Sequence, residues 1–507
     1  MTALLATGGW LPVSVVLSSF LTGIFIFFLR EEDVLMRSLL NLGGAVLKVA
    51  LGILLLWGVA QGFVYTFVLP LGAGLDLILF ADPLALQFVL LSAGLWLVTT
   101  VYAIAFLEGS PERSRFFGYF SLCVTASTGI ALAGNLLTFV IFYEFLTLAT
   151  YPLVVHHGTR EALKAGRTYL IYTLGGGMLL FIGAVWLQGL IGPVVFGPVP
   201  ALAETDLPRG VLIAIFWLIA GGLAVKAAMV PVHGWLPTAM VAPAPVSALL
   251  HAVAVVKAGA FGLFRLVYDV YGIALAGAPA MGGLLAMLAS VTIVYGSLRA
   301  IAESDIKKRL AYSTVSQLSY IALGTALGGP LAAVGALAHL VHQGLMKITL
   351  FFCAGRLAET YDIHNVHELA GMGRRMPVTM TAFTVAALGM IGLPPVAGFV
   401  SKWYLALGGL QTGNDWVLAV LVLSSVLNAA YFLPPLYVAW FTAPPPEARL
   451  QRRILPGWVE WGLLVPPVIT ASLALVAGLL AALPISPLAW AELIVALRYF
   501  PVTGDGP

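Results

Sequence analysis

The chain has 507 residues, of which 61% are hydrophobic and 9% are charged, and its formal net charge is +3. A soluble protein carries about 25% charged residues, so these few charges cannot cover a water-facing surface, and the bilayer is the expected solvent for most of the chain. The small net charge gives no indication of nucleic-acid binding.

Apolar segments long enough to cross a bilayer recur along the whole chain. A spanning helix needs about 20 predominantly apolar residues, and fourteen segments meet this requirement. In chain order they are 10–29, 37–60, 83–107, 116–134, 136–155, 168–190, 211–229, 243–268, 279–298, 309–328, 331–355, 377–411, 416–441 and 462–484. The predicted class is an all-α polytopic membrane protein with about 14 transmembrane helices.

The basic residues lie between these segments in an alternating pattern. Seventeen of the 25 lysines and arginines fall in the first, third, fifth, ninth, eleventh and thirteenth connections. Because cytoplasmic loops hold the excess of basic residues, these connections are expected on the cytoplasmic side of the cell (inner) membrane. Fourteen helices then place both termini on the opposite side.

Eight ionisable residues lie deep inside apolar segments. A charge at the centre of a membrane helix costs about 2.5–3.5 kcal/mol on insertion scales, so such residues are rare and generally functional. The set is Glu144, Lys226, His251, Lys257, His339, His342, Lys347 and Lys402. Buried lysine and histidine can change protonation near pH 7. The recurrence on successive helices therefore predicts a buried pathway for protons, with water bridging the gaps.

Each of these residues also has a structural interpretation. A lone lysine can extend its side chain to the membrane surface, and for Lys48, near the start of its helix, this is as good an explanation as function. His251 alone could bond to a backbone carbonyl in the core. Glu144 could pair with a neighbouring lysine only to pack two helices.

Two of the predicted helices contain prolines that should interrupt them. The stretch MVPVHGWLPTAMVAPAP holds Pro231 and Pro237, and GMIGLPPVAGFVSKW holds Pro394 and Pro395. Proline removes a hydrogen-bond donor, and irregular backbone at membrane depth is tolerated where it lines a cavity or is buried in protein. The breaks fall in the seventh and twelfth helices, which is typical of transporters with inverted repeats.

This spacing predicts four parts of the chain. They are helices 1–3 in residues 1–110, a first five-helix repeat in 111–270, a second in 271–441, and the last helix with the tail in 442–507.

Two loops carry further candidate features. The stretch from Arg299 to Arg309 begins a helix with lysines, which are unfavourable at a helix N-terminus, so it is expected to meet acidic groups or a partner subunit. His364 and His367 have a spacing that could bind a metal, but no further ligands cluster with them, and they are interpreted as loop residues.

No cofactor or metal site is predicted, nor a catalytic site of the chain's own. The sequence contains no GxGxxG, P-loop or CxxC pattern. Cys123 and Cys353 both lie in apolar runs and are too few for an iron–sulfur cluster, which takes four ligands. Any redox chemistry would have to come from partner subunits.

Four segments resemble one family in order and separation. They are VPVHGWLPTAMVAPAPVSALLHAVAVVKAGAFGLFR, SDIKKRLAYSTVSQLSYIALG, HLVHQGLMKITLFFCAG and GLPPVAGFVSKW. Over residues 80–440 the chain resembles the antiporter-like subunits of respiratory complex I and of the multisubunit Mrp-type sodium/proton antiporters. Lys402 in GFVSKW is similar to the D-type Mrp protein, whereas complex I members have glutamate there. Relatives usually read HLLNHALFK where this chain has His342 and Gln343 in HLVHQGLMK.

The resemblance implies a central hydrophilic axis through two inverted repeats. It assigns Glu144 and Lys226 as an interacting pair. His251 and Lys257 would then connect to the second repeat, where His339 and Lys347 continue the axis and Lys402 ends it. Arg167 takes the place of a lysine in many relatives, although arginine does not deprotonate.

The predicted function is proton translocation, with Na⁺ as a second candidate ion in antiport. The expected partners are the bilayer and the other membrane subunits of one complex. The alternatives are a self-sufficient secondary transporter, a scaffold subunit with an unused axis, and a subunit of a complex I-like, hydrogenase or inorganic-carbon-uptake assembly.

Overall fold

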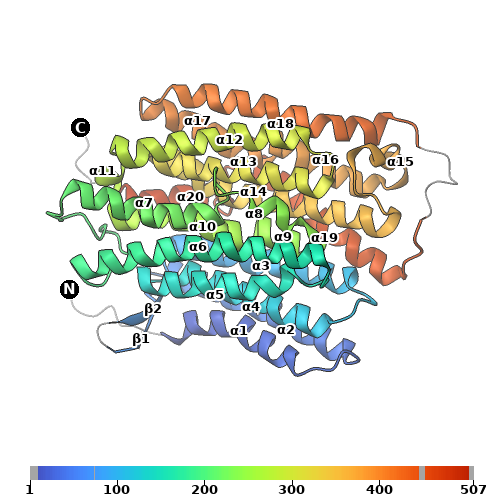
Figure 1. Cartoon of the computed structure of the whole chain (residues 1–507), viewed down its shortest axis with the longest axis horizontal. Coiled ribbons are helices and arrows are strands. Elements are labelled where there is room, and N and C mark those ends of the chain that lie inside the picture. Colours follow the sequence, from blue (N-terminus) through green and yellow to red (C-terminus); the bar gives the residue numbers. More distant parts are fainter. Residues whose placement is uncertain (1–8, 73–74, 445–451, 502–507) are drawn as a thin grey trace. The chain divides into compact units, whose positions relative to one another are not determined.

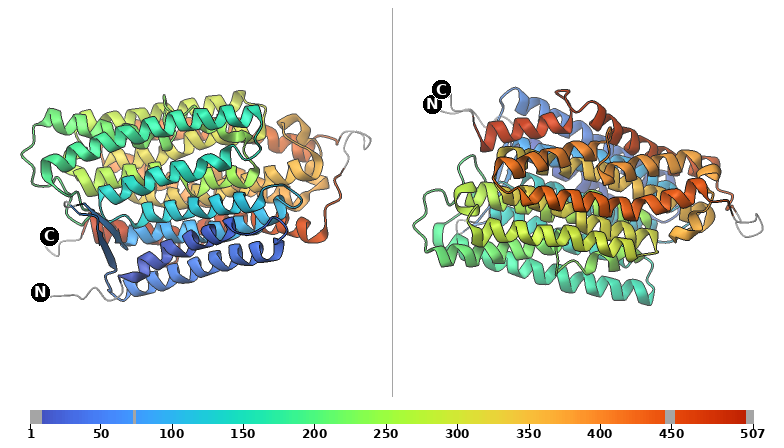
Figure 2. Two further views of the ribbon diagram at one scale, coloured as in Figure 1. Left: turned by 60° about the horizontal axis from the view of Figure 1, so that its bottom comes forward. Right: turned by 90° about the horizontal axis from the view of Figure 1, so that it is seen from above.

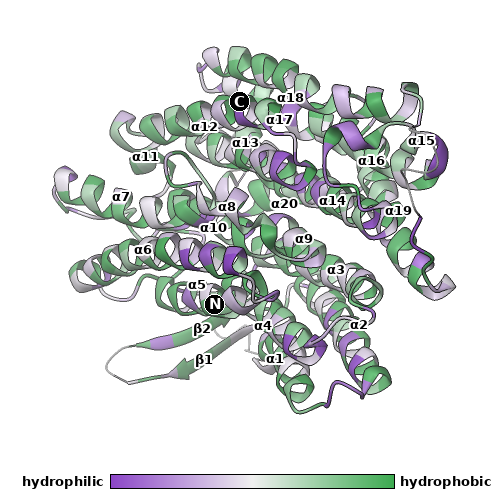
Figure 3. Ribbon diagram, turned by 45° about the vertical axis from the view of Figure 1, so that its right-hand side comes forward, coloured by the Kyte–Doolittle hydropathy of each residue, from purple (hydrophilic) through white to green (hydrophobic). Residues whose placement is uncertain are grey.

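The computed structural model describes residues 9–72, 75–444 and 452–501, and most of these residues are helical (Figure 1). Eleven helices of this described part are long and apolar enough to cross a membrane. Figure 3 shows hydrophobic colouring along most helices and hydrophilic colouring around α15. The chain is therefore a polytopic membrane protein.

The chain divides into two compact units, and the first contains residues 1–100, 109–227 and 253–281. Its main elements are α1 (Trp10–Phe27), α2 (Val34–Ala60), β1 (Thr66–Pro70), β2 (Asp76–Phe80), most of α3 (Pro83–Phe106), α4 (Arg113–Leu132), α5 (Leu136–Val154), α6 (Arg160–Ile191), α7 (Arg209–Lys226), α10 (Val255–Arg265), the π-helix η2 (Leu266–Tyr271) and α11 (Ile273–Ala276). The short π-helix η3 (Pro279–Gly283) begins at the end of this unit.

Local sequence explains where several of these elements begin. The side chain of Asn135 accepts a hydrogen bond from the N–H of Thr138 and starts α5, and Thr159 starts α6 in the same way. Between α2 and α3 the chain forms an antiparallel hairpin of β1 and β2, with Thr66 opposite Phe80. Figure 2 shows this hairpin at one end of α1, where Gly9 lies against the backbone of Thr66.

The second unit contains residues 101–108, 228–252 and 282–507. Its elements are the end of α3, α8 (Trp235–Thr238), η1 (Ala239–Val241), α9 (Ala244–Ala252), α12 (Leu284–Ala302), α13 (Ile306–Leu327), α14 (Pro330–Tyr361), η4 (Val366–Leu369), α15 (Met372–Arg375), α16 (Pro377–Ile391), α17 (Ala397–Gln411), α18 (Trp416–Phe441), α19 (Gly457–Leu479), α20 (Pro487–Ile494) and the π-helix η6 (Val495–Tyr499). The almost fully buried α14 forms its core, and α9, α13, α16, α17 and α19 pack against it.

Each of the fourteen predicted segments contains helix, and the chain is interrupted at both predicted places. After α7 ends at Lys226, irregular backbone leads to α8, and between α16 and α17 lie residues 392–396. Gly392, with φ of +96°, ends α16, and the two prolines that follow cannot continue it.

Three features differ from the sequence-based expectation. The predicted helix 243–268 is broken after Ala252, because Ala254 has a non-helical backbone conformation (φ −108°, ψ −80°), so His251 and Lys257 lie on different helices. The β1–β2 hairpin was not expected, nor was α20 beyond the last predicted segment. Short strands and eight-residue helices lie below the length that a search for spanning segments detects.

Candidate functional site

In the first unit, Lys226 and Glu144 lie near each other on α7 and α5. Lys226 is fully buried, its Nζ lies 3.4 Å from the centre of the Tyr143 ring, and it donates a hydrogen bond to the carbonyl oxygen of Tyr143. The charges of Glu144 and Lys226 are close enough to interact, but the two side chains form no ion pair within 4 Å in the described residues. Lys226 therefore binds the backbone next to the acid rather than the acid itself.

Glu144 is held against the backbone of α6. A Cβ at Gly177 would overlap Oε1 of Glu144, so only glycine leaves room for this carboxylate. Oε1 is buried and has no hydrogen-bond partner among the described residues. A buried carboxylate oxygen without a donor is costly, so this position suits a group that gains a proton or a water molecule.

Glycines also bring α10 close to the end of α7. A Cβ at Gly259 would overlap the amide nitrogen of Ala227, the residue after Lys226. Lys257, two residues earlier on α10, is fully buried. Arg167, on α6, is exposed, so the described structure does not place it within the buried group.

In the second unit, His251 and Lys347 both contact α13. Nδ1 of His251 lies 2.8 Å from Oγ1 of Thr314. Nζ of Lys347 donates to the carbonyl oxygen of Leu310 at 3.0 Å and to the hydroxyl of Ser313. Because Ser313 and Thr314 are adjacent, one turn of α13 holds both ionisable groups through uncharged hydroxyl and carbonyl groups.

Lys402 binds the end of the interrupted helix. Its Nζ donates to the carbonyl oxygens of Met390 at 3.0 Å and Ile391 at 2.8 Å. These carbonyls lack helical partners because α16 ends here, and they carry the negative end of the helix dipole. The break therefore creates a cation-binding position without a carboxylate.

The Met390 carbonyl oxygen is also the centre of a wider polar network. Besides Lys402 it accepts hydrogen bonds from the amides of Gln317 at 3.2 Å and Asn428 at 3.1 Å. The hydroxyl of Tyr431 donates to Oδ1 of Asn428 at 2.8 Å and lies near Ser313. Polar side chains therefore lie in the region between Lys347 and Lys402.

His339 approaches the same region from α14. Its Nδ1 lies 2.8 Å from the hydroxyl of Ser401, which precedes Lys402 in the chain. The centres of the His339 and Tyr320 rings are 5.3 Å apart, and the rings are packed edge to face. The ring of Tyr320 also lies 5.1 Å from Nζ of Lys402. His342 and Gln343 are fully buried on α14, and both side-chain polar atoms of Gln343 have no partner among the described residues.

The first unit contains a buried ionic cluster that the sequence analysis did not predict. Arg265 contacts Asp82 through two hydrogen bonds of 2.7 and 2.9 Å, and its Nη1 lies 2.7 Å from Asp269. All three side chains are at most 2% exposed. Asp82 and Asp269 are therefore buried more deeply than Glu144, which is half-buried. The i, i+4 spacing of Arg265 and Asp269 is typical of an ion pair on one helix and could have indicated their contact. Asp82 is too far away in sequence for its contact with Arg265 to be predicted.

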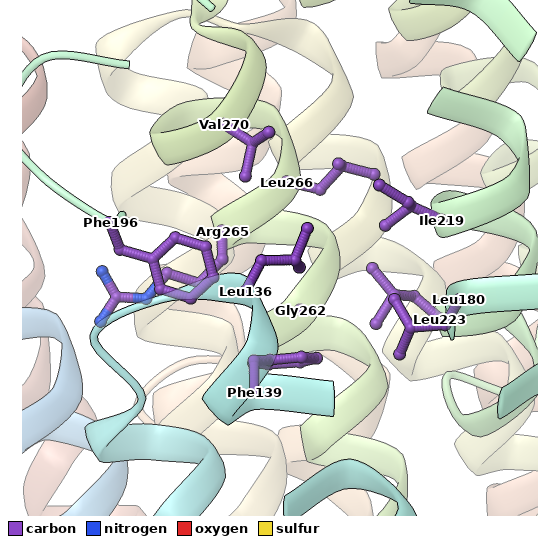
Figure 4. Close-up of a pocket in the computed structure, with 10 residues that line it drawn as sticks. All are labelled: Leu136, Phe139, Leu180, Phe196, Ile219, Leu223, Gly262, Arg265, Leu266 and Val270. Carbon is purple, nitrogen blue, oxygen red and sulfur yellow. The ribbon is translucent and has the colours of Figure 1, made fainter. Parts of the chain in front are cut away.

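A small cavity lies beside this cluster (Figure 4). Its volume is about 10 Å³, roughly the space that one water molecule requires. Apolar side chains such as Leu136, Phe139 and Leu223 line it, and Arg265 contributes the charged group. Figure 4 shows the guanidinium beside the ring of Phe196, 5.5 Å from its centre. This cavity is too small for a transported solute.

Lys48 does not reach the membrane surface. It is fully buried on α2, donates to the Ser19 hydroxyl at 2.6 Å, and lies 5.4 Å from the centre of the Trp96 ring. Ser19 in turn lies 2.8 Å from the Thr125 hydroxyl. The surface-reaching alternative for Lys48 is therefore wrong, and the side chain joins three helices.

The loop that contains His364 and His367 contacts the start of α13. Asp305 caps α13 through the N–H of Lys308, and Ile306 bonds to the carbonyl of His364. The acidic group expected at this cationic start is thus supplied by Asp305 itself. His367 lies on η4, 3.8 Å from Glu368.

Glu368 stabilises this loop. Its Oε2 accepts the N–H groups of His364 at 2.7 Å and Asn365 at 2.8 Å. Burial raises the pKa of Glu368, but the hydrogen bonds from Asn365 and His364 outweigh burial, and its pKa lies below the usual value.

Comparisons with known proteins agree with one another. Residues 133–428 match the family described as NADH:quinone oxidoreductase/Mrp antiporter, transmembrane. The chain is 38% identical over 397 residues to NADH-quinone oxidoreductase subunit N of Desulforudis audaxviator, and the match covers 78% of each chain. It is 26% identical to a Na(+)/H(+) antiporter subunit of Bacillus subtilis over 92% of each chain. Its fold resembles a chain of the Mrp complex from Dietzia, with a TM-score of 0.84, 23% identity and 98% of each chain covered.

Proposed function

The chain belongs to the NADH:quinone oxidoreductase/Mrp antiporter transmembrane family, and on that premise we propose that it is a proton-translocating subunit of a multisubunit membrane complex. The observation that best supports this proposal is the buried polar network at the second break, where the Met390 carbonyl oxygen accepts hydrogen bonds from Lys402, Gln317 and Asn428. Each member of this network is a group that can donate or accept a hydrogen bond.

The proposed pathway uses ionisable residues inside the helices of both units. Its members are Glu144, Lys226, Lys257, His251, His342, Lys347, His339 and Lys402. Lysines held by hydroxyl and carbonyl oxygens can release a proton without leaving an opposite charge behind. Arg167 does not deprotonate, and its proposed role is to set the local charge.

Glu144 and Lys226 form the proposed switch. A carboxylate nearby favours the charged form of a lysine. Protonation of Glu144, whose Oε1 has no donor among the described residues, removes that influence and allows Lys226 to pass its proton onward. Water in the gaps completes the path.

The proposed topology has fourteen crossings. The repeats occupy residues 111–270 and 271–441, and both termini lie on the non-cytoplasmic side of the cell (inner) membrane. The basic connections support this orientation. Other membrane subunits of the complex are the proposed partners.

Two assemblies remain candidates for the source of energy. The higher identity to a quinone oxidoreductase subunit favours a redox-driven pump. The nearly complete alignment with a Na(+)/H(+) antiporter subunit supports antiport, with Na⁺ as the second ion. Flux in vesicles separates them, because a pump responds to electron donor and quinone, whereas an antiporter responds to an imposed Na⁺ gradient.

The test of the proposal is ion flux by the assembled complex in vesicles. Glu144→Gln and Lys226→Met should each lower proton flux at least tenfold, because each removes one member of the switch. Lys164→Met, which changes an exposed lysine on α6, serves as the matched control. Normal flux in both variants, with normal assembly, would identify the chain as a scaffold. Flux by the chain alone would instead favour a self-sufficient transporter.

A further inference from the structure

A basic pocket lies at the N-terminal ends of α16 and α19, apart from the proposed proton pathway. Its volume is about 140 Å³. Arg356 at the end of α14, Arg375 on α15 and Arg452 before α19 contribute three positive charges, and Glu460 contributes one negative charge. All of these residues belong to the second unit.

The negative charge in this pocket is already paired. Glu460 accepts a hydrogen bond from Arg452 at 2.5 Å. Arg356 donates to the hydroxyl of Thr379, and no carboxylate of the described residues lies within 4 Å of Arg356 or Arg375. The N-termini of α16 and α19 add further positive potential. The pocket is therefore complementary to an anion.

An apolar groove continues from this pocket along α16 and α19. The two cavities share Pro377 and Val378, and the groove has a volume of about 370 Å³. Ala382, Ala471 and Ser472 line it, and their small side chains leave room between the helices. From Val378 to Val385 the groove follows α16 for roughly 10 Å into the apolar part of the molecule.

We propose that this composite cavity binds one anionic phospholipid, with its phosphate among Arg356, Arg375 and Arg452 and an acyl chain in the groove. Arginine binds phosphate through paired, charge-assisted hydrogen bonds. The pocket lies on the predicted cytoplasmic face, where basic pockets between membrane helices meet anionic headgroups. A free phosphate would use the pocket and leave the groove without a role, and a neutral lipid would use only the groove.

The first experiment measures lipid binding by the purified full-length chain in detergent. A ligand that binds the folded state raises the midpoint of thermal unfolding. Phosphatidylglycerol should raise it, and phosphatidylcholine at the same concentration should not. Arg375→Gln should weaken the apparent affinity for phosphatidylglycerol about tenfold. Arg374→Gln is the matched control, because Arg374 is the exposed neighbour on α15 and does not line the pocket.

The second experiment separates a lipid from a free anion. Ser472→Leu places a larger side chain at an exposed position of the groove, and it should weaken phosphatidylglycerol binding while the response to inorganic phosphate stays unchanged. Equal binding of both lipids, or wild-type affinity in Arg375→Gln, would overturn the proposal. So would an equal effect of inorganic phosphate with no effect of Ser472→Leu. None of these measurements depends on proton flux.

Discussion

The two interrupted helices hold their lysines in different ways. At the first break, Lys226 ends α7 and donates to the backbone of Tyr143, next to the carboxylate of Glu144. At the second, Lys402 turns back onto the carbonyls of Met390 and Ile391 in its own broken segment. The first lysine experiences a charge that can be neutralised, whereas the second experiences fixed dipoles. The comparison teaches that one architecture can give a buried lysine either a switchable or a constant electrostatic environment.

The largest expected effect comes from moving the acid at the first break. In Gly177→Ala, the new Cβ would overlap Oε1 of Glu144 and displace the carboxylate. A small displacement of a reacting group costs roughly ten- to a hundredfold in rate, and proton flux in vesicles should fall by at least tenfold.

Gly175→Ala is the control for this substitution. A Cβ there meets nothing within 4 Å, and both variants gain the same helix propensity. Equal flux in the two variants would mean that proton flux does not depend on the position of Glu144. It would contradict the proposal that a switchable charge distinguishes the first break from the second.

A smaller effect is expected from cutting the network at the second break. Tyr431→Phe removes only the hydroxyl that donates to Asn428. Loss of one hydrogen bond is worth about 0.5–1.5 kcal/mol, so flux should fall roughly two- to tenfold. Tyr437→Phe, on the exposed face of the same helix, should retain wild-type flux. A similar loss in both variants would contradict the proposed link.

The smallest effect is expected at a buried lysine that lies at no break. Lys48→Met keeps a long unbranched side chain in the place where Lys48 donates to Ser19. Ser19 keeps its contact with the Thr125 hydroxyl, so the substitution leaves no buried acceptor without a partner, and flux should change less than about twofold. A strong loss of flux with normal assembly would place Lys48 in a proton pathway and extend the comparison to a third site.

The sequence was most informative where a residue conflicts with its surroundings. Lysine in an apolar run and proline in a helix stand out locally, so the buried positions of Lys226, Lys347 and Lys402 and both helix interruptions could be predicted. The roles of these residues in proton transfer stay predictions. Each of these residues can be recognised from its own neighbours in the sequence, so the long separations between them along the chain did not prevent the prediction.

The neutral groups that lie near Lys347 and Lys402 could not be predicted. Ser313, Tyr431 and Asn428 are neutral, and such residues occur throughout membrane helices at little cost. Asp82 and Arg265 are 183 positions apart, and only the fold brings them together. The break at Ala254 has no proline to mark it.

The acceptor at the centre of the second site is a main-chain atom. The carbonyl oxygen of Met390 receives Lys402, Gln317 and Asn428, and no codon change at position 390 can delete it. Substitutions at any one donor leave two others in place. Heritable variation can therefore adjust the strength of this site in small steps, while the site itself persists as long as the helix ends there.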